Sequence, residues 1–245
     1  MAFKYAANLA CRPYKKRTVV NETGGRLLVG AIDFGTSYSG WAFSFKHENK
    51  RSPPGATVKI WDAGTITTEK TPTCLLLKPD GTFDSFGYDA EKRYGKLSAK
   101  HLHSKYFFFR HFKMKLYEPY GKGIKRDMMI HDEIGKQFLA IDVFSISLKY
   151  LVKDMMETVN QRTVGELLPP DIGWVLTVPA IWSDASKQFM REAAIKAGID
   201  EDQLSIALEP EAASIYCRHL PVAASGNETI SKLPAGTKYI VVDAG

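Results

Sequence analysis

The sequence has few cysteines, and their spacing excludes two classes of protein. Its 245 residues contain three, Cys11, Cys74 and Cys217, which lie far apart along the chain. A disulfide framework or a structural zinc site needs an even set or closely spaced pairs. We therefore expect a protein of a reducing compartment, and its apolar content of 44% is sufficient for a sizeable core.

Long apolar runs are also missing. No stretch approaches the roughly 18 apolar residues that a membrane span needs, and the N-terminus lacks the continuous apolar core of a secretory signal. We expect a cytoplasmic location, with the nucleus left open, and no secretion. The basic start resembles a mitochondrial transit peptide, but it has little helical amphipathicity and contains Pro13. Residues 1–25 are therefore predicted to form a disordered tail.

The body of the protein has no basic field, although the formal net charge is +6. Residues 1–25 hold five Lys or Arg against one acid, so four of the six net charges fall in that tail. Nucleic-acid binders carry a basic patch on the folded domain, and no groove-reading or RNA-binding motif is found here. Nucleic acid is not an expected partner.

Apolar segments bounded by turn residues alternate with amphipathic segments, which predicts an α/β protein with a parallel sheet. Residues 142–161 show the clearest helical pattern, because apolar residues recur there at steps of three and four. An inserted smaller α+β subdomain is expected over about 60–135. The expected strands are 27–33, 41–45, 73–77, 82–86, 173–178 and 238–243. The expected helices begin at 88 and cover 142–161, 184–197 and 209–218.

One short pattern occurs twice, each time after an apolar strand. Residues 30–35 and 240–245 both place Asp-x-Gly at the strand end, which indicates a duplicated nucleotide-binding lobe. Gly35 would let backbone N–H groups approach phosphate closely, and small hydroxyl residues follow it. Asp33 would repel phosphate, so its expected partner is Mg²⁺ held through water. Taken alone, the motif is more often an ordinary hairpin turn.

Four blocks in order resemble the Hsp70 and actin superfamily, most closely its heat shock 70 kDa protein 12 branch. They are residues 29–39, 176–184, 208–213 and 242–245. The resemblance covers about residues 27–245. It implies an actin-like (ribonuclease H-like) ATPase lobe with a mixed sheet and flanking helices over 26–235. Residues 236–245 would open a second lobe, so the chain is expected to be a truncated first lobe.

The resemblance also implies roles for individual residues around ATP or ADP and Mg²⁺. Asp33 and Asp243 would hold the hydrated metal, and Glu209 would reach its water shell. Lys113 would be the catalytic lysine, with Lys105 and Lys115 as nearby alternatives. The phosphates would be lined by Gly35, Thr36, Ser37, Tyr38 and Gly245. Pro179 and Lys187 would couple the nucleotide to domain movement, although Pro179 is also a plain strand terminator.

The sequence departs from the family pattern at two positions, and two alternatives to the ATPase function remain open. Lys187 stands where the chaperones usually have Arg, and Leu208 where they usually have Asn, so interdomain signalling is expected to differ. No peptide-binding domain follows, so chaperone activity is not assigned to this chain, and client proteins are unknown. One alternative is a non-catalytic fragment that binds nucleotide or a protein partner. The less favoured alternative is a sugar kinase of the same superfamily.

Overall fold

The computed structural model describes most of the chain. The described residues are 26–48, 55–64, 66–117, 124–165, 167–217 and 236–241. The predicted tail of residues 1–25 lies outside these ranges, and so do Asp243 and Gly245.

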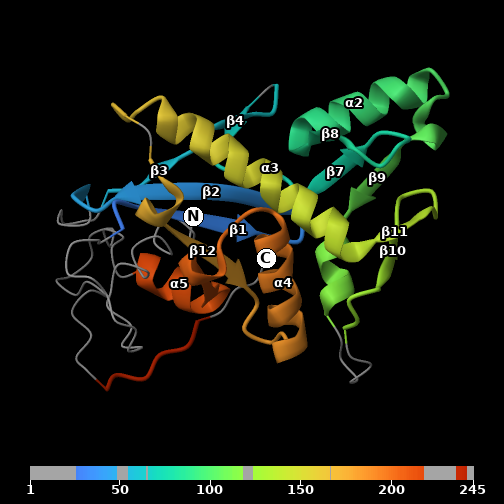
Figure 1. Ribbon diagram of the computed structural model, residues 1–245. Helices are drawn as coiled ribbons and strands as arrows, with labels where there is room; N and C mark the ends of the chain where they lie inside the picture. The colour runs from blue at the N-terminus through green and yellow to red at the C-terminus, as the bar shows by residue number, and fades with distance from the viewer. Residues whose placement is uncertain are drawn as a thin grey trace, which may run out of the picture.

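A mixed six-stranded sheet forms the centre of the structure (Figure 1). Its order is β13-β12-β1-β2-β3, and β6 also pairs with β2. Strands β1, β12 and β13 run parallel, whereas β2 runs antiparallel to β1. The bounds are β1 Leu28–Phe34, β2 Tyr38–Phe45, β3 Thr57–Val58, β6 Thr71–Pro72, β12 Ile172–Val178 and β13 Leu204–Leu208.

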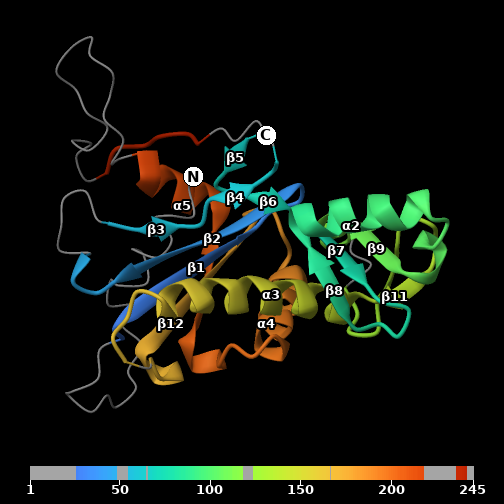
Figure 2. The same ribbon diagram turned by 90° about the horizontal axis from the view of Figure 1, so that it is seen from above.

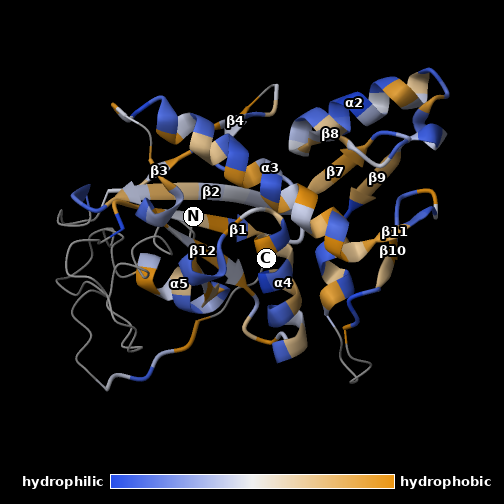
Figure 3. Ribbon diagram, in the orientation of Figure 1, coloured by the Kyte–Doolittle hydropathy of each residue, from blue (hydrophilic) through white to orange (hydrophobic). Residues whose placement is uncertain are grey.

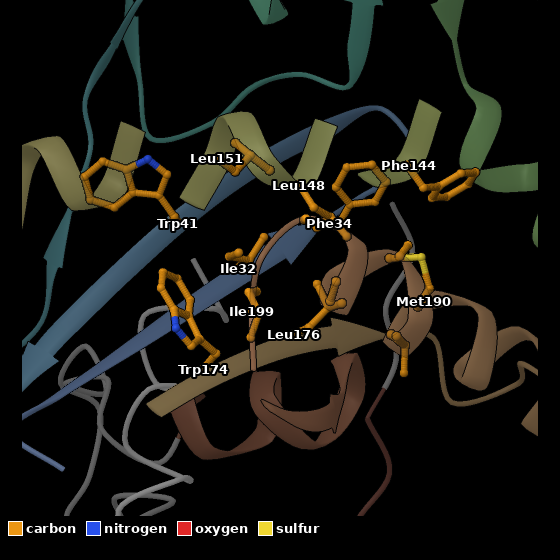
Figure 4. Close-up of a cluster of buried hydrophobic side chains, with 14 of the residues drawn as sticks. Ile32, Phe34, Trp41, Phe144, Leu148, Leu151, Trp174, Leu176, Met190 and Ile199 are labelled. Atoms are coloured by element: carbon orange, nitrogen blue, oxygen red, sulfur yellow. The ribbon is translucent and has the colours of Figure 1, made fainter. Parts of the chain in front are cut away.

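Helices cover both faces of this sheet. Helices α3 (Ala140–Asn160) and α4 (Asp184–Lys196) pack on one face, and the short helix α5 (Glu209–Cys217) lies on the other (Figure 2). Alternate side chains of β1 pack on opposite faces of the sheet. Ile32 and Phe34 belong to the core under α3, whereas Val29 and Ala31 pack with Ala212 of α5. Figure 4 shows the larger of these cores, between the sheet and the two helices. This arrangement confirms the expected mixed α/β class.

The sheet β8-β7-β9 and the hairpin β10-β11 lie beyond one end of the main sheet, whereas the hairpin β4-β5 lies beside β6 (Figure 2). The antiparallel order β8-β7-β9 is covered by α2, whose Ala90 and Leu97 pack against Leu76 and Phe108. These elements fall within residues 60–135, but the boundaries of a separate subdomain there stay a prediction. The bounds are β7 Cys74–Leu77, β8 Phe83–Phe86, α2 Gly87–Ala99, β9 Phe107–Arg110, the hairpin β10 Met129–His131 with β11 Gln137–Leu139, and the hairpin β4 Trp61–Asp62 with β5 Thr67–Thr68.

The helix predicted from the apolar pattern of residues 142–161 is confirmed as α3. Its alternating apolar and polar bands are visible in Figure 3. The apolar residues at steps of three and four are completely buried: Phe144, Leu148, Leu151, Met155 and Val159. No described helix is long and apolar enough to cross a membrane.

The turns and caps read from the sequence are also present. Gly81 adopts a φ of 80° between β7 and β8, so the predicted hairpin is confirmed. The Ser183 side chain accepts a hydrogen bond from the Ser186 N–H and caps α4, and Gly198, with a φ of 104°, follows its end. The strand predicted for 238–243 is wrong over 238–241. These residues are exposed and pair with no strand in the described part of the chain, and an extended segment without a neighbour forms no ladder.

Candidate functional site

Three parallel strands end at the same edge of the main sheet, and each brings a polar residue there. Asp33 near the end of β1 lies opposite Thr177 of β12, and Glu209 is the first residue after β13. The carboxyl ends of parallel strands are where α/β sheets bind their ligands. The register of the sheet therefore gathers a carboxylate, a hydroxyl and a second carboxylate from positions up to 176 residues apart.

Asp33 is held by two side-chain partners. Lys70 places its Nζ 2.6 Å from Oδ2, and the Thr177 hydroxyl donates to Oδ1 at 2.9 Å. Burial would raise the pKa of the Asp33 carboxyl, but the charges of Lys70 and Lys113 and the two hydrogen bonds outweigh burial and lower it. Its side chain retains 13% exposure. Asp33 is therefore an anion that remains accessible from one side.

Lys113 and Glu209 form the second charged pair of the site. The Lys113 Nζ lies 2.6 Å from Glu209 Oε1 and 5.3 Å from the centre of the Trp182 ring. The Lys113 side chain is only 3% exposed, against 27% for Glu209. A lysine buried to this extent needs a nearby anion, because an unpaired ammonium is costly to desolvate. Glu209 supplies that anion and leaves part of its own carboxylate open to solvent.

Local backbone geometry explains why Lys113, and neither of the nearby lysines, enters the site. His111, the residue after β9, has a left-handed φ of 48° and leads the chain into the short 3₁₀ helix η3 (Phe112–Leu116). The turn buries Lys113 between Phe112 and Leu116, whereas Lys105 and Lys115 remain exposed. The structure thus separates the three candidates that the sequence left close together.

The turn after Asp33 is tight and supported from a second segment. A Cβ on Gly35 would lie 2.2 Å from the Tyr38 carbonyl oxygen, so only glycine fits there. Thr73 donates its hydroxyl hydrogen to the Gly35 carbonyl at 2.8 Å and its N–H to the Ser37 carbonyl at 2.8 Å. Ser37 and Tyr38 are exposed, and Thr36 reaches the Met114 sulfur at 3.8 Å. Thr73 therefore supports this turn from the neighbouring segment, and the turn presents the Ser37 and Tyr38 side chains to solvent.

Pro179 and Lys187 take different positions. Pro179 ends β12 and lines a shallow hollow of about 140 Å³ together with Thr36, Lys113 and Trp182. Lys187 lies on α4, where its Nζ is 3.8 Å from Asp184 Oδ1 of the same helix. The structure therefore brings Pro179 to the site, while the described ion-pair partner of Lys187 belongs to its own helix and not to the cluster around Asp33.

Sequence reasoning missed three residues of the site. Lys70 and Thr73 flank β6, and a local reading of Glu69 to Thr73 offers no signal, because their role comes from the pairing of β6 with β2. Thr177 belonged to a predicted strand and to the family block of residues 176–184, but no role in the site was expected for it. Its position at the end of a parallel strand beside β1 was the signal that could have identified it. The predicted contributions of Asp243 and Gly245 lie outside the described residues.

The donor set suits magnesium held through water. The described residues contain no group of three or more His, Cys, Asp or Glu side chains able to enclose a metal. Instead, two separate carboxylates, those of Asp33 and Glu209, lie at one edge of the sheet and can accept hydrogen bonds. Beside them is the tight turn in which only glycine fits at position 35. Mg²⁺ retains several waters and takes its other ligands from a few carboxylates and from substrate phosphates. The residues present therefore fit a hydrated ion that is shared with a phosphate group.

Comparison with known proteins shows which proteins the chain is similar to. No protein-family model matches the chain. It is 33% identical to human heat shock 70 kDa protein 12A over 92% of its own length, and 41% identical to human heat shock 70 kDa protein 12B over 79%. The chain is a homologue of the heat shock 70 kDa protein 12 branch. Mouse heat shock 70 kDa protein 12A is 39% identical over 82% of the chain.

The resemblance stated from the sequence is thereby confirmed. The chain spans less than half the length of these relatives, namely 40% of human 12A, 28% of human 12B and 30% of mouse 12A. The mixed α/β fold is consistent with an actin-like ATPase lobe.

Proposed function

We propose that this chain supplies the phosphate- and magnesium-binding half of an ATP site. The observation that carries the proposal is the meeting of Asp33, Thr177 and Glu209 at the ends of three parallel strands, with the buried Lys113 beside them. A complete Hsp70-like protein containing this lobe would hydrolyse ATP by in-line attack of water on the γ-phosphate.

Each group of the cluster has a distinct task in this proposal. Bound Mg²⁺ would neutralise phosphate charge, and its waters would donate to the Asp33 carboxylate. Lys113 carries a positive charge at a fixed position, because Glu209 and Trp182 hold its Nζ. That charge stabilises negative charge on the phosphate and orients the attacking water. The hydroxyl groups of Thr36 and Ser37 donate to phosphate oxygens.

Binding of ATP to the 245-residue chain tests the first part. We expect calorimetry to detect Mg²⁺-dependent binding that weakens at least about tenfold in Asp33→Asn, since the metal-supporting charge is lost. Asp154→Asn is the matched control, because Asp154 also pairs with a lysine, Lys59, and its side chain is also 13% exposed. Equal affinities in the two variants would refute the assignment of Asp33.

Hydrolysis is tested on a longer version that includes the rest of the relatives' length. Asp33→Asn and Lys113→Met should each lower turnover by at least about a hundredfold, the range expected for removing a main electrostatic contact to the transition state. Undiminished turnover in Asp33→Asn would exclude the mechanism. Transfer of phosphate to any sugar in a panel would favour the kinase alternative instead.

A second candidate function, binding of a protein partner without catalysis, has one specific observation in its favour. Apolar side chains stand exposed beside the site, with Ile181 at 75% and Met114 at 53%. Both line the hollow next to Thr36, and exposed apolar groups of this kind recruit partners. Concentration-dependent oligomers that disappear in Ile181→Ser would support this function, whereas a monodisperse monomer that binds no hydrophobic dye would oppose it.

A further inference from the structure

Lys70 adds a second cation to the charged cluster, and its position is determined by the fold. It directly precedes β6, which pairs with the start of β2 through Thr71 and Pro72. Thr73, on the other side of β6, supports the turn after Asp33 through the Gly35 and Ser37 carbonyls. The segment of residues 70–73 is therefore part of the same rigid unit as the phosphate turn.

The pairing of Lys70 with Asp33 is close and sheltered. The Lys70 Nζ lies 2.6 Å from Asp33 Oδ2, and the two side chains are 32% and 13% exposed. Together with the Lys113–Glu209 pair, this pair gives two carboxylates and two ammonium groups among the described residues, and the formal charges of these two pairs cancel without any metal. A cluster with Lys113 alone would carry one net negative charge at the edge where a divalent cation is expected.

We propose that Lys70 is a built-in counter-cation of Asp33, a positioning residue that competes with the divalent ion for this carboxylate and makes nucleotide binding less dependent on Mg²⁺. The proposal deepens the nucleotide-binding function above and rests on it. A positive charge in contact with Asp33 repels Mg²⁺ and attracts the oxygens of uncomplexed ATP. It also holds the carboxylate in one orientation, together with the Thr177 hydroxyl.

The first experiment measures the metal alone, so that it does not depend on nucleotide binding. Free Mn²⁺ is followed by electron paramagnetic resonance as it is titrated into the intact chain. Lys70→Met should raise the Mn²⁺ affinity by about fivefold or more, because Asp33 loses its counter-charge. Lys70→Arg, which keeps the charge, should stay within about twofold of the wild type. The double variant Asp33→Asn with Lys70→Met should lose the gain.

Lys59 provides a matched control elsewhere in the fold. It pairs with Asp154, and the two side chains are 29% and 13% exposed, close to the values for Lys70 and Asp33. Lys59→Met should leave the Mn²⁺ affinity of the candidate site unchanged, since Asp154 lies on α3 and its pair with Lys59 is not part of the cluster formed by Asp33, Lys113 and Glu209. Thermal unfolding of each variant shows whether it folds, and Lys70→Gln replaces Lys70→Met if the latter does not.

The second experiment compares ATP affinity with Mg²⁺ and with EDTA. The dissociation constant in EDTA divided by the dissociation constant in Mg²⁺ should rise about tenfold in Lys70→Met, because uncomplexed ATP then binds more weakly. If no variant binds ATP in either condition, the proposed function fails, while the Mn²⁺ titration still decides the role of Lys70. Unchanged Mn²⁺ affinity in folded Lys70→Met and Lys70→Gln would overturn the proposal.

Discussion

Replacing Glu209 and replacing Lys113 should lower the free energy of unfolding by different amounts, although the two residues form one ion pair. Replacing Glu209 leaves an ammonium that is 3% exposed without its contact anion, whereas replacing Lys113 leaves a carboxylate that is 27% exposed and partly hydrated. Breaking a buried pair from one side costs about 3–5 kcal/mol, mainly through the charge left behind. An apolar replacement of the buried member removes that charge altogether.

The magnitude follows from what remains around Lys113. Asp33 still interacts with its charge, and the Trp182 ring lies 5.3 Å from its Nζ, so part of the loss is offset. We expect Glu209→Gln to lower the free energy of unfolding by about 2 kcal/mol, below the full range for a buried pair. Lys113→Met keeps the apolar stem and should cost less than about 1 kcal/mol.

Urea denaturation measures both values, provided that the slope of the free energy with urea is unchanged between variants. The double variant should be close to Lys113→Met alone, because no buried charge then remains to be compensated. Equal costs for the two single variants, or a larger cost for Lys113→Met, would refute the reasoning that the exposure of the remaining partner determines the loss.

Three further predictions concern the turn, the core and a buried thiol. Gly35→Ala should destabilise the chain by about 1–3 kcal/mol in urea denaturation and abolish ATP binding, because its Cβ would meet the Tyr38 carbonyl. The control Gly95→Ala in α2 should be neutral or stabilising, because a Cβ there would have no atom within 4 Å. Leu148→Ala should cost about 2–5 kcal/mol by the cavity left under α3, and the exposed Lys149→Ala less than about 0.5 kcal/mol in the same assay. Burial raises the pKa of Cys74 from 9.0 to about 12, so the neutral thiol stabilises the fold below pH 9, and this contribution should be lost as pH rises toward 12. In Cys74→Ala, the free energy of unfolding measured against pH should no longer show the part of the decline above pH 9 that the thiol causes.

Much of the fold could be predicted from the sequence because its signals are local. The apolar spacing from Phe144 to Val159 defines one helix face, and the Pro79-Asp80-Gly81 turn defines a hairpin, without reference to distant residues. The strand expected over 238–241 failed for the opposite reason. An apolar run becomes a strand only when another strand pairs with it, and the described residues provide no neighbour there.

The candidate site was predictable only in part, since its residues come together through long-range pairing. Asp33 and Glu209 stood in motifs that could be recognised one by one. The choice of Lys113 over its neighbours depends on the left-handed His111, and a positive φ at histidine leaves no mark in the sequence. Lys70 reaches Asp33 because β6 pairs with β2, a contact between residues more than 30 positions apart.

The register of the sheet therefore has chemical consequences beyond packing. Thr177 lies opposite Asp33 on the neighbouring parallel strand, and its hydroxyl reaches the carboxylate from there. A slip of β12 by one residue would turn Thr177 to the other face and place Leu176 or Val178 beside Asp33. Leu176 and Val178 are both buried, at 1% and 0% exposure, so such a slip would also expose the core. The alternation of apolar residues that stabilises the sheet therefore also keeps the Thr177 hydroxyl beside the Asp33 carboxylate.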